Sequence, residues 1–480
     1  MSTAVSKNKK SYYIDIAVIL LLMFGFGYLP AIAPLTPMGQ QTLGIFISLI
    51  YAWARGSMIW PSVLALIAFG YIGENTVTNV FVSAFGNQTL LMVVWIMVFA
   101  AAVERCGLLQ FVAEWVLSKK FVTKSPMMMA LGFFIASVLA GVFVGNPAAS
   151  IFIWAIFYDV IGKLGVPRKS PYVTAILIGV VVLTYTGNAI LPYYVFLQIG
   201  LGIMQAMDPN FTMNVGAYCL LAIAINIVLV PALLLVTKLL CRNVHFEINE
   251  EIIKKSNNKL NREQKIVLAT LVSVILLLII PNILPVGPVK VFFSNIGTIG
   301  AMCLGAIVLM VVTANGHPIS DIGESMKTAL PWNMYFMLAA ALAISSGITA
   351  EGTGVLDMLK VVFGPLLEGK TMFVFMAVLT LIGIFLTNIM NNIVTYTLLI
   401  PLSLAFAGAC GVSTALIVGI LAIILCQGVV MPSGSVMGAL LHTNTSWLST
   451  GMIYKYAICF EVVLAIVTIA VGIPVGYMLF

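Results

Sequence analysis

Residues 386–395 read LTNIMNNIVT, so three asparagines and two threonines interrupt a strongly apolar run. The apolar pieces on either side, 371–386 and 394–407, are each roughly 15 residues long, whereas a helix needs about 20 residues to cross a ~30 Å hydrocarbon layer. We therefore predict that the polar stretch is a turn and that the two half-helices form a re-entrant hairpin. A weaker copy occurs at 144–148, VGNPA, between the apolar segments 127–143 and 150–164.

The composition excludes a soluble globular protein. Hydrophobic residues make up 61% of the 480 residues and charged residues 8%, whereas soluble domains carry about 25% charged residues. We predict an all-α polytopic protein of the cell (plasma or inner) membrane, because helices satisfy their own backbone groups in lipid. The net charge of +7 does not indicate a nucleic-acid partner, since the Lys and Arg residues lie in short patches between apolar spans.

The first half of the chain shows a regular order of spans. Lys7, Lys9 and Lys10 precede the first apolar run, so the positive-inside rule predicts a cytoplasmic N-terminus. Full spans are expected near 13–33, 39–54, 58–74, 88–103 and 212–240, the first hairpin at about 126–164, and a span broken at Thr184–Pro192 within 171–200. The polar segment 241–265 is expected to be a cytoplasmic linker.

The second half repeats this order. Two spans near 265–285 and 295–315 precede a long span from Leu330, the hairpin at about 371–407, a span broken near 431–435 and a last span at 453–479. The spacing of Glu104 and Gly107 recurs in Glu351 and Gly354. We predict two inverted-topology repeats, 1–240 and 266–480, with about 11 transmembrane helices, hairpins entering from opposite sides and an extracellular C-terminus.

The hairpin tips are the predicted binding site. Half-helix N-termini carry about +0.5 charge and favour anions, and carbonyls freed where a helix unwinds can coordinate Na⁺. Asn146 and Asn392 have both donor and acceptor atoms, so each can contact an anion and a cation. The alternative is that these asparagines only bond their own turns. Neither tip carries Lys or Arg, so amides, hydroxyls and helix ends would hold a substrate carboxylate.

Acidic residues within or beside apolar spans are candidates for proton coupling, since each costs about 2.5–3.5 kcal/mol at the centre of a membrane helix. They are Glu104, Glu114, Asp159, Glu351 and Glu461. Glu461 lies deepest within a span.

An intramembrane enzyme is the rival class, but the chain has no HExxH or GxSxG motif. A channel is a further rival, although two oppositely inserted gates suit alternating access better. No cofactor or metal site is expected beyond Na⁺.

Over nearly its whole length the chain resembles the divalent anion:sodium symporter (DASS) family of the ion transporter superfamily. The matching stretches are the opening pattern within 35–46, LPWN at 330–333, and the second hairpin with Thr387, Asn392 and LLIP at 398–401. The resemblance implies an elevator-type transporter and a homodimer. It also implies one Ser-Asn-Thr motif at each tip, whereas the tips here read GNP at 145–147 and NNI at 391–393, so the asparagines match and the hydroxyls do not.

The resemblance carries site residues over position by position. Thr387 matches a sodium-site threonine, Gly141 stands where the family has serine, and Gly187 matches a glycine whose carbonyl serves a sodium site. The implied substrate contacts are Asn146, Pro147, Asn188, Asn391, Asn392 and Ser435. The implied cation contacts are Gly141, Gly145, Asn146, Gly187, Thr387, Met390, Asn392 and Gly434.

Together these observations predict a secondary active transporter of an organic or divalent anion resembling a di- or tricarboxylate, coupled to Na⁺ or working by anion exchange. The missing hydroxyls leave a monocarboxylate, a sulfonate or a larger organic anion as alternatives. A proton-coupled transporter, or an exporter of a monocarboxylate, sulfonate or sulfate from another branch of the superfamily, is the second reading. The expected partners are the small-molecule anion, the lipid bilayer and a second copy of the chain.

Overall fold

The computed structural model describes residues 9–72, 75–143, 145–208, 211–241, 246, 248, 259–285, 287–314, 316–328, 330–350, 352–390 and 392–480. Within these residues nine helices are long and apolar enough to cross a membrane. The strands of the described chain, β1 (Thr313–Ala314) and β2 (His317–Pro318), form one short antiparallel pair. The prediction of an all-α polytopic protein is confirmed. The first arms of both predicted hairpins, Pro126–Phe143 and Met372–Ile389, have 18 residues and are among the nine, so they are longer than the roughly 15 residues predicted. Shorter apolar helices form the second arm of the second hairpin, Asn392–Ala407, and parts of the broken spans.

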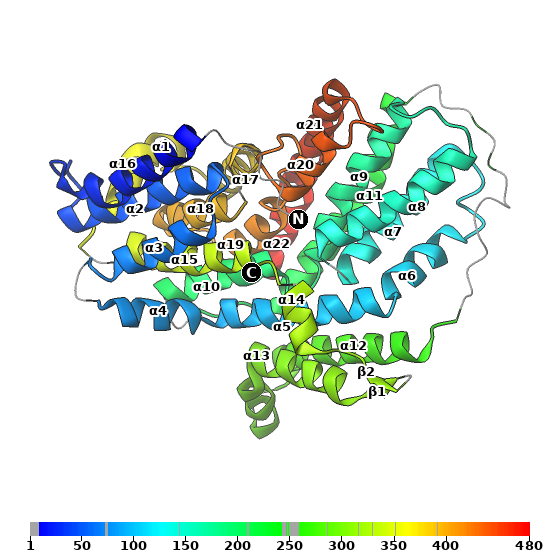
Figure 1. The fold of residues 1–480 in the computed structure, drawn as a ribbon, viewed down its shortest axis with the longest axis horizontal. Coiled ribbons are helices and arrows are strands. Elements are labelled where there is room, and N and C mark those ends of the chain that lie inside the picture. Colours follow the sequence, from blue (N-terminus) through cyan, green and yellow to red (C-terminus); the bar gives the residue numbers. More distant parts are fainter. Residues whose placement is uncertain are drawn as a thin grey trace.

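The helices of the first half lie close to the predicted spans (Figure 1). They are α1 (Lys9–Leu20), η1 (Leu21–Gly25), η2 (Phe26–Tyr28), α2 (Pro37–Ala54), α3 (Ile59–Phe69), α4 (Val77–Phe85), α5 (Gln88–Arg105), α6 (Leu108–Leu117), α7 (Pro126–Phe143), α8 (Asn146–Lys163), α9 (Pro171–Asn188), α10 (Val195–Met207) and α11 (Val215–Leu240). Helix α4 was not predicted. It has nine residues, begins at the side-chain cap of Thr76 and is too short to be a span.

The second half begins after the linker, most of which lies outside the described residues. Its helices are α12 (Arg262–Ile283), α13 (Pro288–Val311), α14 (Ile322–Thr328), α15 (Trp332–Thr349), α16 (Val355–Leu367), α17 (Met372–Ile389), α18 (Asn392–Ala407), α19 (Thr414–Ile424), α20 (Val436–Thr443), α21 (Thr450–Val467), η4 (Thr468–Gly472) and α22 (Ile473–Leu479). Gly297, with φ +61°, breaks α13 internally.

The two halves share an order of elements. A long helix, a short amphipathic helix, a helical hairpin and a discontinuous helix follow one another in α5–α10 and again in α15–α20. Gly107 and Gly354 occupy the same place in this order, directly before α6 and α16, with φ of +67° and +70°. This left-handed conformation favours glycine, which explains the repeated spacing. The inverted orientation of the halves stays a prediction.

The discontinuous helices form the interior. All residues of α9 from Tyr172 to Gly187 are buried, and so is α19 from Leu416 to Ile424. Helix α9 packs against the first hairpin, α19 packs against the second, and α9 and α19 contact each other. A helix that is apolar on all sides belongs in the centre of a bundle. Each element predicted to be broken therefore packs against the hairpin of its own half.

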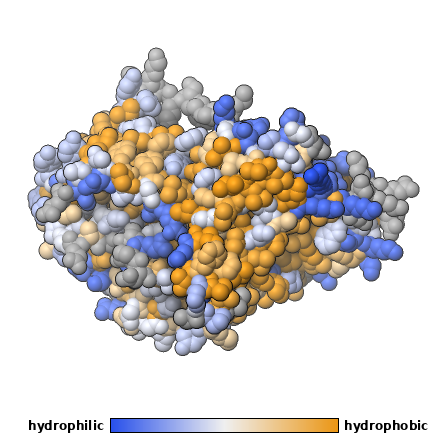
Figure 2. Space-filling view, turned by 90° about the horizontal axis from the view of Figure 1, so that it is seen from below, coloured by the Kyte–Doolittle hydropathy of each residue, from blue (hydrophilic) through white to orange (hydrophobic). Residues whose placement is uncertain are grey.

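The outer helices expose apolar side chains. Helices α12 and α13 lie at the lower edge of Figure 1, and the face seen from that side in Figure 2 carries a broad hydrophobic area. Exposed apolar residues on these two helices include Val272, Leu276, Val291, Phe292, Leu304 and Ile307. A soluble monomer rarely exposes so large an apolar surface, so this surface fits contact with lipid.

Candidate functional site

The tip of the second hairpin is narrower than predicted. Helix α17 continues to Ile389 and α18 begins at Asn392, so Thr387 and Asn388 lie in the last turn of α17. Both side chains find hydrogen-bond partners there: Asn388 Nδ2 donates to the carbonyl of Ile384 in the same helix at 2.8 Å, and Thr387 bonds the carbonyl of Leu425 outside it. Met390 ends α17 in an extended conformation. Asn391 lies outside the described residues.

Oxygen atoms converge behind this tip. Thr387 Oγ1 lies 2.8 Å from Asn392 Oδ1 and also within hydrogen-bonding distance of the carbonyl of Leu425. Asn392 Nδ2 donates to the carbonyl of Cys426 at 3.2 Å. Thr387 and Asn392 are buried. A hydroxyl has a single hydrogen and cannot donate fully to both acceptors, so three oxygens meet with too few donors. Such an arrangement suits a hard cation.

The second discontinuous helix unwinds beside these oxygens. Helix α19 ends at Ile424 and α20 begins at Val436, so the break is longer than predicted. A Cβ on Gly428 would lie 2.5 Å, and one on Gly434 2.9 Å, from the carbonyl oxygen of Thr387, so only glycine fits at both places. Ser435 Oγ donates to the carbonyl of Gly428 at 2.6 Å and caps α20. The structure therefore brings Thr387, Asn392, Gly434 and Ser435 together.

A buried carboxyl group adjoins this site. Glu461 on α21 is 3% exposed, and its Oε2 accepts a hydrogen bond from Asn388 Nδ2 at 2.7 Å. Its Oε1 accepts from the backbone N–H of Val429 at 3.4 Å, while Asn388 Oδ1 accepts from the N–H of Val430 at 2.8 Å. The sequence predicted Glu461 as a candidate for proton coupling but did not predict these hydrogen-bond partners.

The first hairpin is also closed by a short tip. Helix α7 ends at Phe143 and α8 begins at Asn146, with Gly145 at its N-cap in open space and Pro147 exposed in its first turn. Asn146 and Pro147 are thus helical residues and not part of a turn. Nothing is described of the Asn146 side chain, so its predicted role stays a prediction.

The last turn of α7 lies directly against α9. Asn188 Nδ2 donates to the carbonyl of Gly141 at 2.8 Å. A Cβ on Gly141 would overlap the carbonyl oxygen of Thr184, and one on Gly187 would overlap that of Val138, so these two glycines allow the backbones to approach. The structure therefore brings Gly141, Gly187 and Asn188 together.

The break in the first discontinuous helix lies later than predicted. Helix α9 stays helical to Asn188, where Thr184 bonds both the carbonyl of Val181 and the hydroxyl of Ser150, and the break covers 189–194.

The two clusters are linked through α9 and the broken segment of the second half. Gln427 Nε2 lies 3.5 Å from the carbonyl of Val182, and the hydroxyl of Tyr185 lies beside Ser435. On the second helix of the first hairpin, α8, the ring of Tyr158 stacks on the ring of Trp447, which lies between α20 and α21, with 4.4 Å between the ring centroids. Elements of both halves therefore surround the site.

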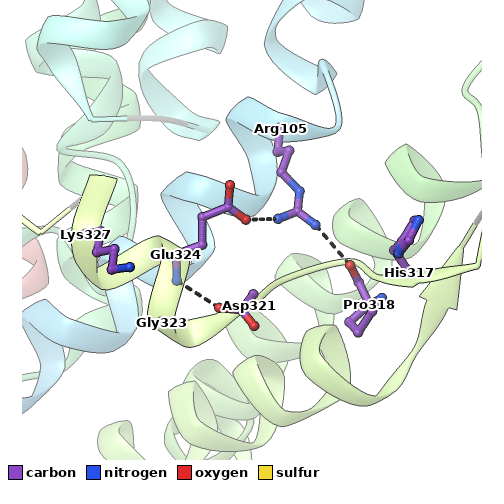
Figure 3. Close-up of a pocket in the computed structure, with 7 residues that line it drawn as sticks. All are labelled: Arg105, His317, Pro318, Asp321, Gly323, Glu324 and Lys327. Atoms are coloured by element: carbon purple, nitrogen blue, oxygen red, sulfur yellow. Dashed lines mark hydrogen bonds and ion pairs between the residues drawn. The ribbon is translucent and has the colours of Figure 1, made fainter.

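An open pocket lies elsewhere, where α5 meets α14 (Figure 3). It has a volume of about 500 Å³ and is lined by Arg105, His317, Pro318, Asp321, Gly323, Glu324 and Lys327. Arg105 points toward Glu324, with Nη1 2.8 Å from Oε2, and also donates to the carbonyl of Pro318 at 3.1 Å. Glu104 lines an adjoining cavity of about 320 Å³. None of these contacts was predicted from the sequence.

The remaining candidate carboxylates are less suited to proton coupling. Glu114 accepts a hydrogen bond from Gln110, and Asp159 pairs with Lys163 on an exposed helix face. Glu351 lies outside the described residues. Exposed pairs of this kind interact weakly in water, so Glu461 is the described candidate with a buried setting.

Comparison with known proteins identifies the family. A sequence model described as citrate transporter matches residues 48–428, which include both hairpins and the segment from α19 to Gly428. The chain belongs to the citrate transporter family. No curated protein sequence matches the chain.

Two solved structures share the fold of this citrate transporter family member. The YdaH transporter of Alcanivorax borkumensis is 13% identical, with a TM-score of 0.60 over 92% of this chain and 98% of that one. Neisseria gonorrhoeae MtrF, whose structure is presented as illuminating a class of antimetabolite efflux pumps, is 14% identical, with a TM-score of 0.54 over 96% and 94%. The predictions of a multi-pass membrane transporter and of a protein that is not an enzyme are confirmed.

Proposed function

We propose that this protein is a secondary active transporter of an organic anion with two or three carboxylates, driven by a cation bound at the second hairpin tip. The observation that carries the proposal is the convergence of Thr387 Oγ1, Asn392 Oδ1 and the Leu425 carbonyl. The family to which the chain belongs is named for citrate, which supports a polycarboxylate substrate. The specific resemblance to divalent anion:sodium symporters is part of this proposal.

The cation would connect the hairpin to the discontinuous helix. Thr387 belongs to α17, Asn392 begins α18 and Leu425 follows α19, so one ion at their oxygens ties three elements together. Binding would order the tip before the anion arrives. Na⁺ is the ion proposed here, because hydroxyl, amide and carbonyl oxygens are neutral hard ligands. Gly434 adds close backbone packing against Thr387. The equivalent contacts proposed for the first tip are Gly141, Gly145, Asn146 and Gly187.

The anion would lie at the helix ends beside the cation. Both amide atoms of Asn392 already have protein partners, so its proposed part is to hold the tip while the N-terminus of α18 faces the anion. The other proposed substrate contacts are Asn146, Pro147, Asn188, Asn391 and Ser435. Each hairpin packs against the discontinuous helix of its own half, and α9 contacts α19, which supports an elevator-type displacement, with the fixed scaffold supplied by a homodimer.

The test is an uptake assay in proteoliposomes with citrate, C4-dicarboxylates, sulfate and sulfonates, with and without a Na⁺ gradient. We expect citrate-like anions to accumulate and the Na⁺ gradient to drive them. Thr387→Val removes one cation ligand and should raise the Na⁺ concentration for half-maximal uptake about tenfold or more.

Thr380→Val is the matched control, since Thr380 is also buried on α17 and its bond among the described residues is to its own helix, at the carbonyl of Met376. Equal Na⁺ dependence in both variants would remove the cation site, and uptake of no tested anion would contradict the function. A proton-coupled cycle is the second candidate, favoured by the buried Glu461.

A further inference from the structure

Three buried polar atoms near the second discontinuous helix have no hydrogen-bond partner among the described residues. They are the hydroxyl oxygens of Tyr194 and Tyr218 and the side-chain oxygen Oε1 of Gln427. Tyr194 directly precedes α10, Tyr218 lies on α11 and Gln427 follows α19. Tyr194 is 4% exposed and the other two are fully buried. Buried hydroxyls and amides almost always have a partner in the protein or in ordered water, so three such atoms in one region point to a bound ligand.

The thiol of Cys426 lies at the centre of this group. The hydroxyl of Tyr194 lies beside the thiol, and Tyr218 lies close enough to Cys426 to interact electrostatically with it. Gln427 Nε2 lies 3.7 Å from Cys426 Sγ, so the unpartnered Oε1 of the same amide is nearby as well. The hydroxyl of Tyr396 on α18 also lies near Tyr218 and Cys426. These five side chains, from elements of both halves, form one buried polar group, named here the tyrosine cluster.

Water is the ligand that fits the tyrosine cluster. A phenol hydroxyl donates one hydrogen and accepts, an amide oxygen only accepts, and a thiol bonds weakly. A bound cation would be coordinated by the oxygens but would leave the hydroxyl hydrogens of Tyr194 and Tyr218 without acceptors. A water molecule can accept from one hydroxyl and donate to the other and to Gln427 Oε1. Buried waters typically make about three such bonds.

The tyrosine cluster adjoins the proposed cation site through the segment between α19 and α20. At the start of this segment the carbonyl of Leu425 lies against Thr387 Oγ1, and the carbonyl of Cys426 accepts from Asn392 Nδ2 at 3.2 Å. The side chains of Cys426 and Gln427 belong to the cluster. The same short stretch of backbone therefore holds the hairpin tip with its carbonyls and the cluster with its side chains.

We propose that the tyrosine cluster binds an ordered water molecule, held by Tyr194, Tyr218 and Gln427, which fixes the backbone of residues 425–427 beside the hairpin tip. The water supplies the hydrogen bonds that these side chains lack among themselves. With residues 425–427 fixed, their carbonyls stay directed at Thr387 and Asn392. The water site does not depend on transport, whereas its effect on cation binding rests on the proposed function.

A structure of the purified protein at a resolution that shows ordered solvent tests the site directly. Density for a water molecule is expected at about 2.7–3.0 Å from the hydroxyl oxygens of Tyr194 and Tyr218. Well-defined tyrosine rings without such density overturn the proposal. A peak surrounded by oxygens at about 2.3–2.6 Å, the distances of a hard cation, overturns it as well.

Thermal unfolding of Tyr218→Phe tests the same bond without a new structure. If the hydroxyl binds water, its removal should lower the unfolding midpoint in detergent by about 1–3 °C. If the hydroxyl is unpaired, its removal leaves the midpoint equal or higher, and the proposal is overturned. The matched control is Tyr172→Phe on α9, whose buried hydroxyl donates to the carbonyl of Pro126 at 2.6 Å and whose loss should lower the midpoint to a similar degree.

Uptake in proteoliposomes tests the effect on the cation site. Tyr218→Phe should raise the Na⁺ concentration for half-maximal uptake about threefold or more, because groups that orient the ligands of an ion affect its affinity. Tyr172→Phe should leave it unchanged, since its bond lies at the start of α7. An unchanged Na⁺ dependence in Tyr218→Phe overturns the link to the cation site but leaves the transport function intact. Failure of the wild type to move any anion contradicts the transport function, while the density and the unfolding midpoints still decide the water site.

Discussion

Asn188 Nδ2 donates to the carbonyl oxygen of Gly141 at 2.8 Å and so ties the end of α9 to the last turn of α7. The second half has a corresponding bond between Thr387 on α17 and the carbonyl of Leu425 after α19. In each half, therefore, the first helix of the hairpin is fixed to the discontinuous helix next to its tip. The tips and the helix breaks form one structural unit in both halves.

The first prediction concerns the close approach of α7 and α9. Gly141→Ala would place a methyl group against the carbonyl oxygen of Thr184, which belongs to backbone and cannot move easily. Overpacking of this kind costs about 1–3 kcal/mol. We expect a lower thermal unfolding midpoint in detergent and a loss of uptake.

The matched control is Gly162→Ala on α8, where a Cβ would meet nothing within 4 Å. This substitution should leave the midpoint equal or slightly higher, because alanine favours helix more than glycine does. A similar loss in both variants would show that the Gly141 contact has no special part in stability.

The second prediction concerns Asn392. Its amide joins Thr387 on one side to the carbonyl of Cys426 on the other, so Asn392→Ala leaves the buried Cys426 carbonyl without this donor, while Thr387 keeps its bond to the carbonyl of Leu425. Each unpaired buried group costs about 1–3 kcal/mol. We expect uptake to be abolished while membrane insertion, measured by yield and monodispersity, is retained. Transport at the wild-type level would exclude Asn392 from the site.

Much of the fold follows from local sequence. The apolar spans and the polar interruptions near 146, 190, 391 and 432 were predicted because hydropathy and Gly/Pro placement act over a few residues. The boundaries were less accurate. Thr387 and Thr184 stay helical where breaks were predicted, since each finds a tertiary partner, Leu425 or Ser150, that no local pattern reveals.

The candidate site shows the same limit. Thr387, Asn392, Gly434 and Ser435 were predicted as site residues, and the structure brings them together. The bond between Asn388 and Glu461 joins residues 73 positions apart, and the Arg105–Glu324 pair spans 219 positions. Such pairings depend on how whole helices pack, so a single sequence without homologues contains little sign of them.

The third prediction concerns the Arg105–Glu324 pair, which joins α5 to α14 at the open pocket. Its side chains are 47% and 61% exposed, so water screens the interaction. A double-mutant cycle with Arg105→Gln and Glu324→Gln, followed by thermal unfolding, should give a coupling of about 0.2–1 kcal/mol that decreases with added salt. A coupling well above that range, insensitive to salt, would mean that the pair becomes buried in another conformation.

The last prediction asks whether the two halves of the site move together. The stack of Tyr158 on Trp447 and the bond from Asn444 Nδ2 to the Tyr158 hydroxyl, at 2.6 Å, join α8 to the loop between α20 and α21. If the hairpins and discontinuous helices are displaced as one block, this contact persists throughout the cycle. A bifunctional thiol reagent that links Tyr158→Cys to Trp447→Cys should then leave uptake within about twofold of the unlinked double variant, a difference of about 0.4 kcal/mol in free energy.

The same double variant without the reagent controls for loss of the stacked rings, and each single cysteine variant with the reagent controls for modification alone. Because the native cysteines are mostly buried, the reagent should act mainly at the introduced pair. Uptake that is lost on linking and regained when the link is cleaved would mean that α8 separates from the second half during transport. In that case each hairpin would act as an independent gate, and the single-block displacement would have to be abandoned.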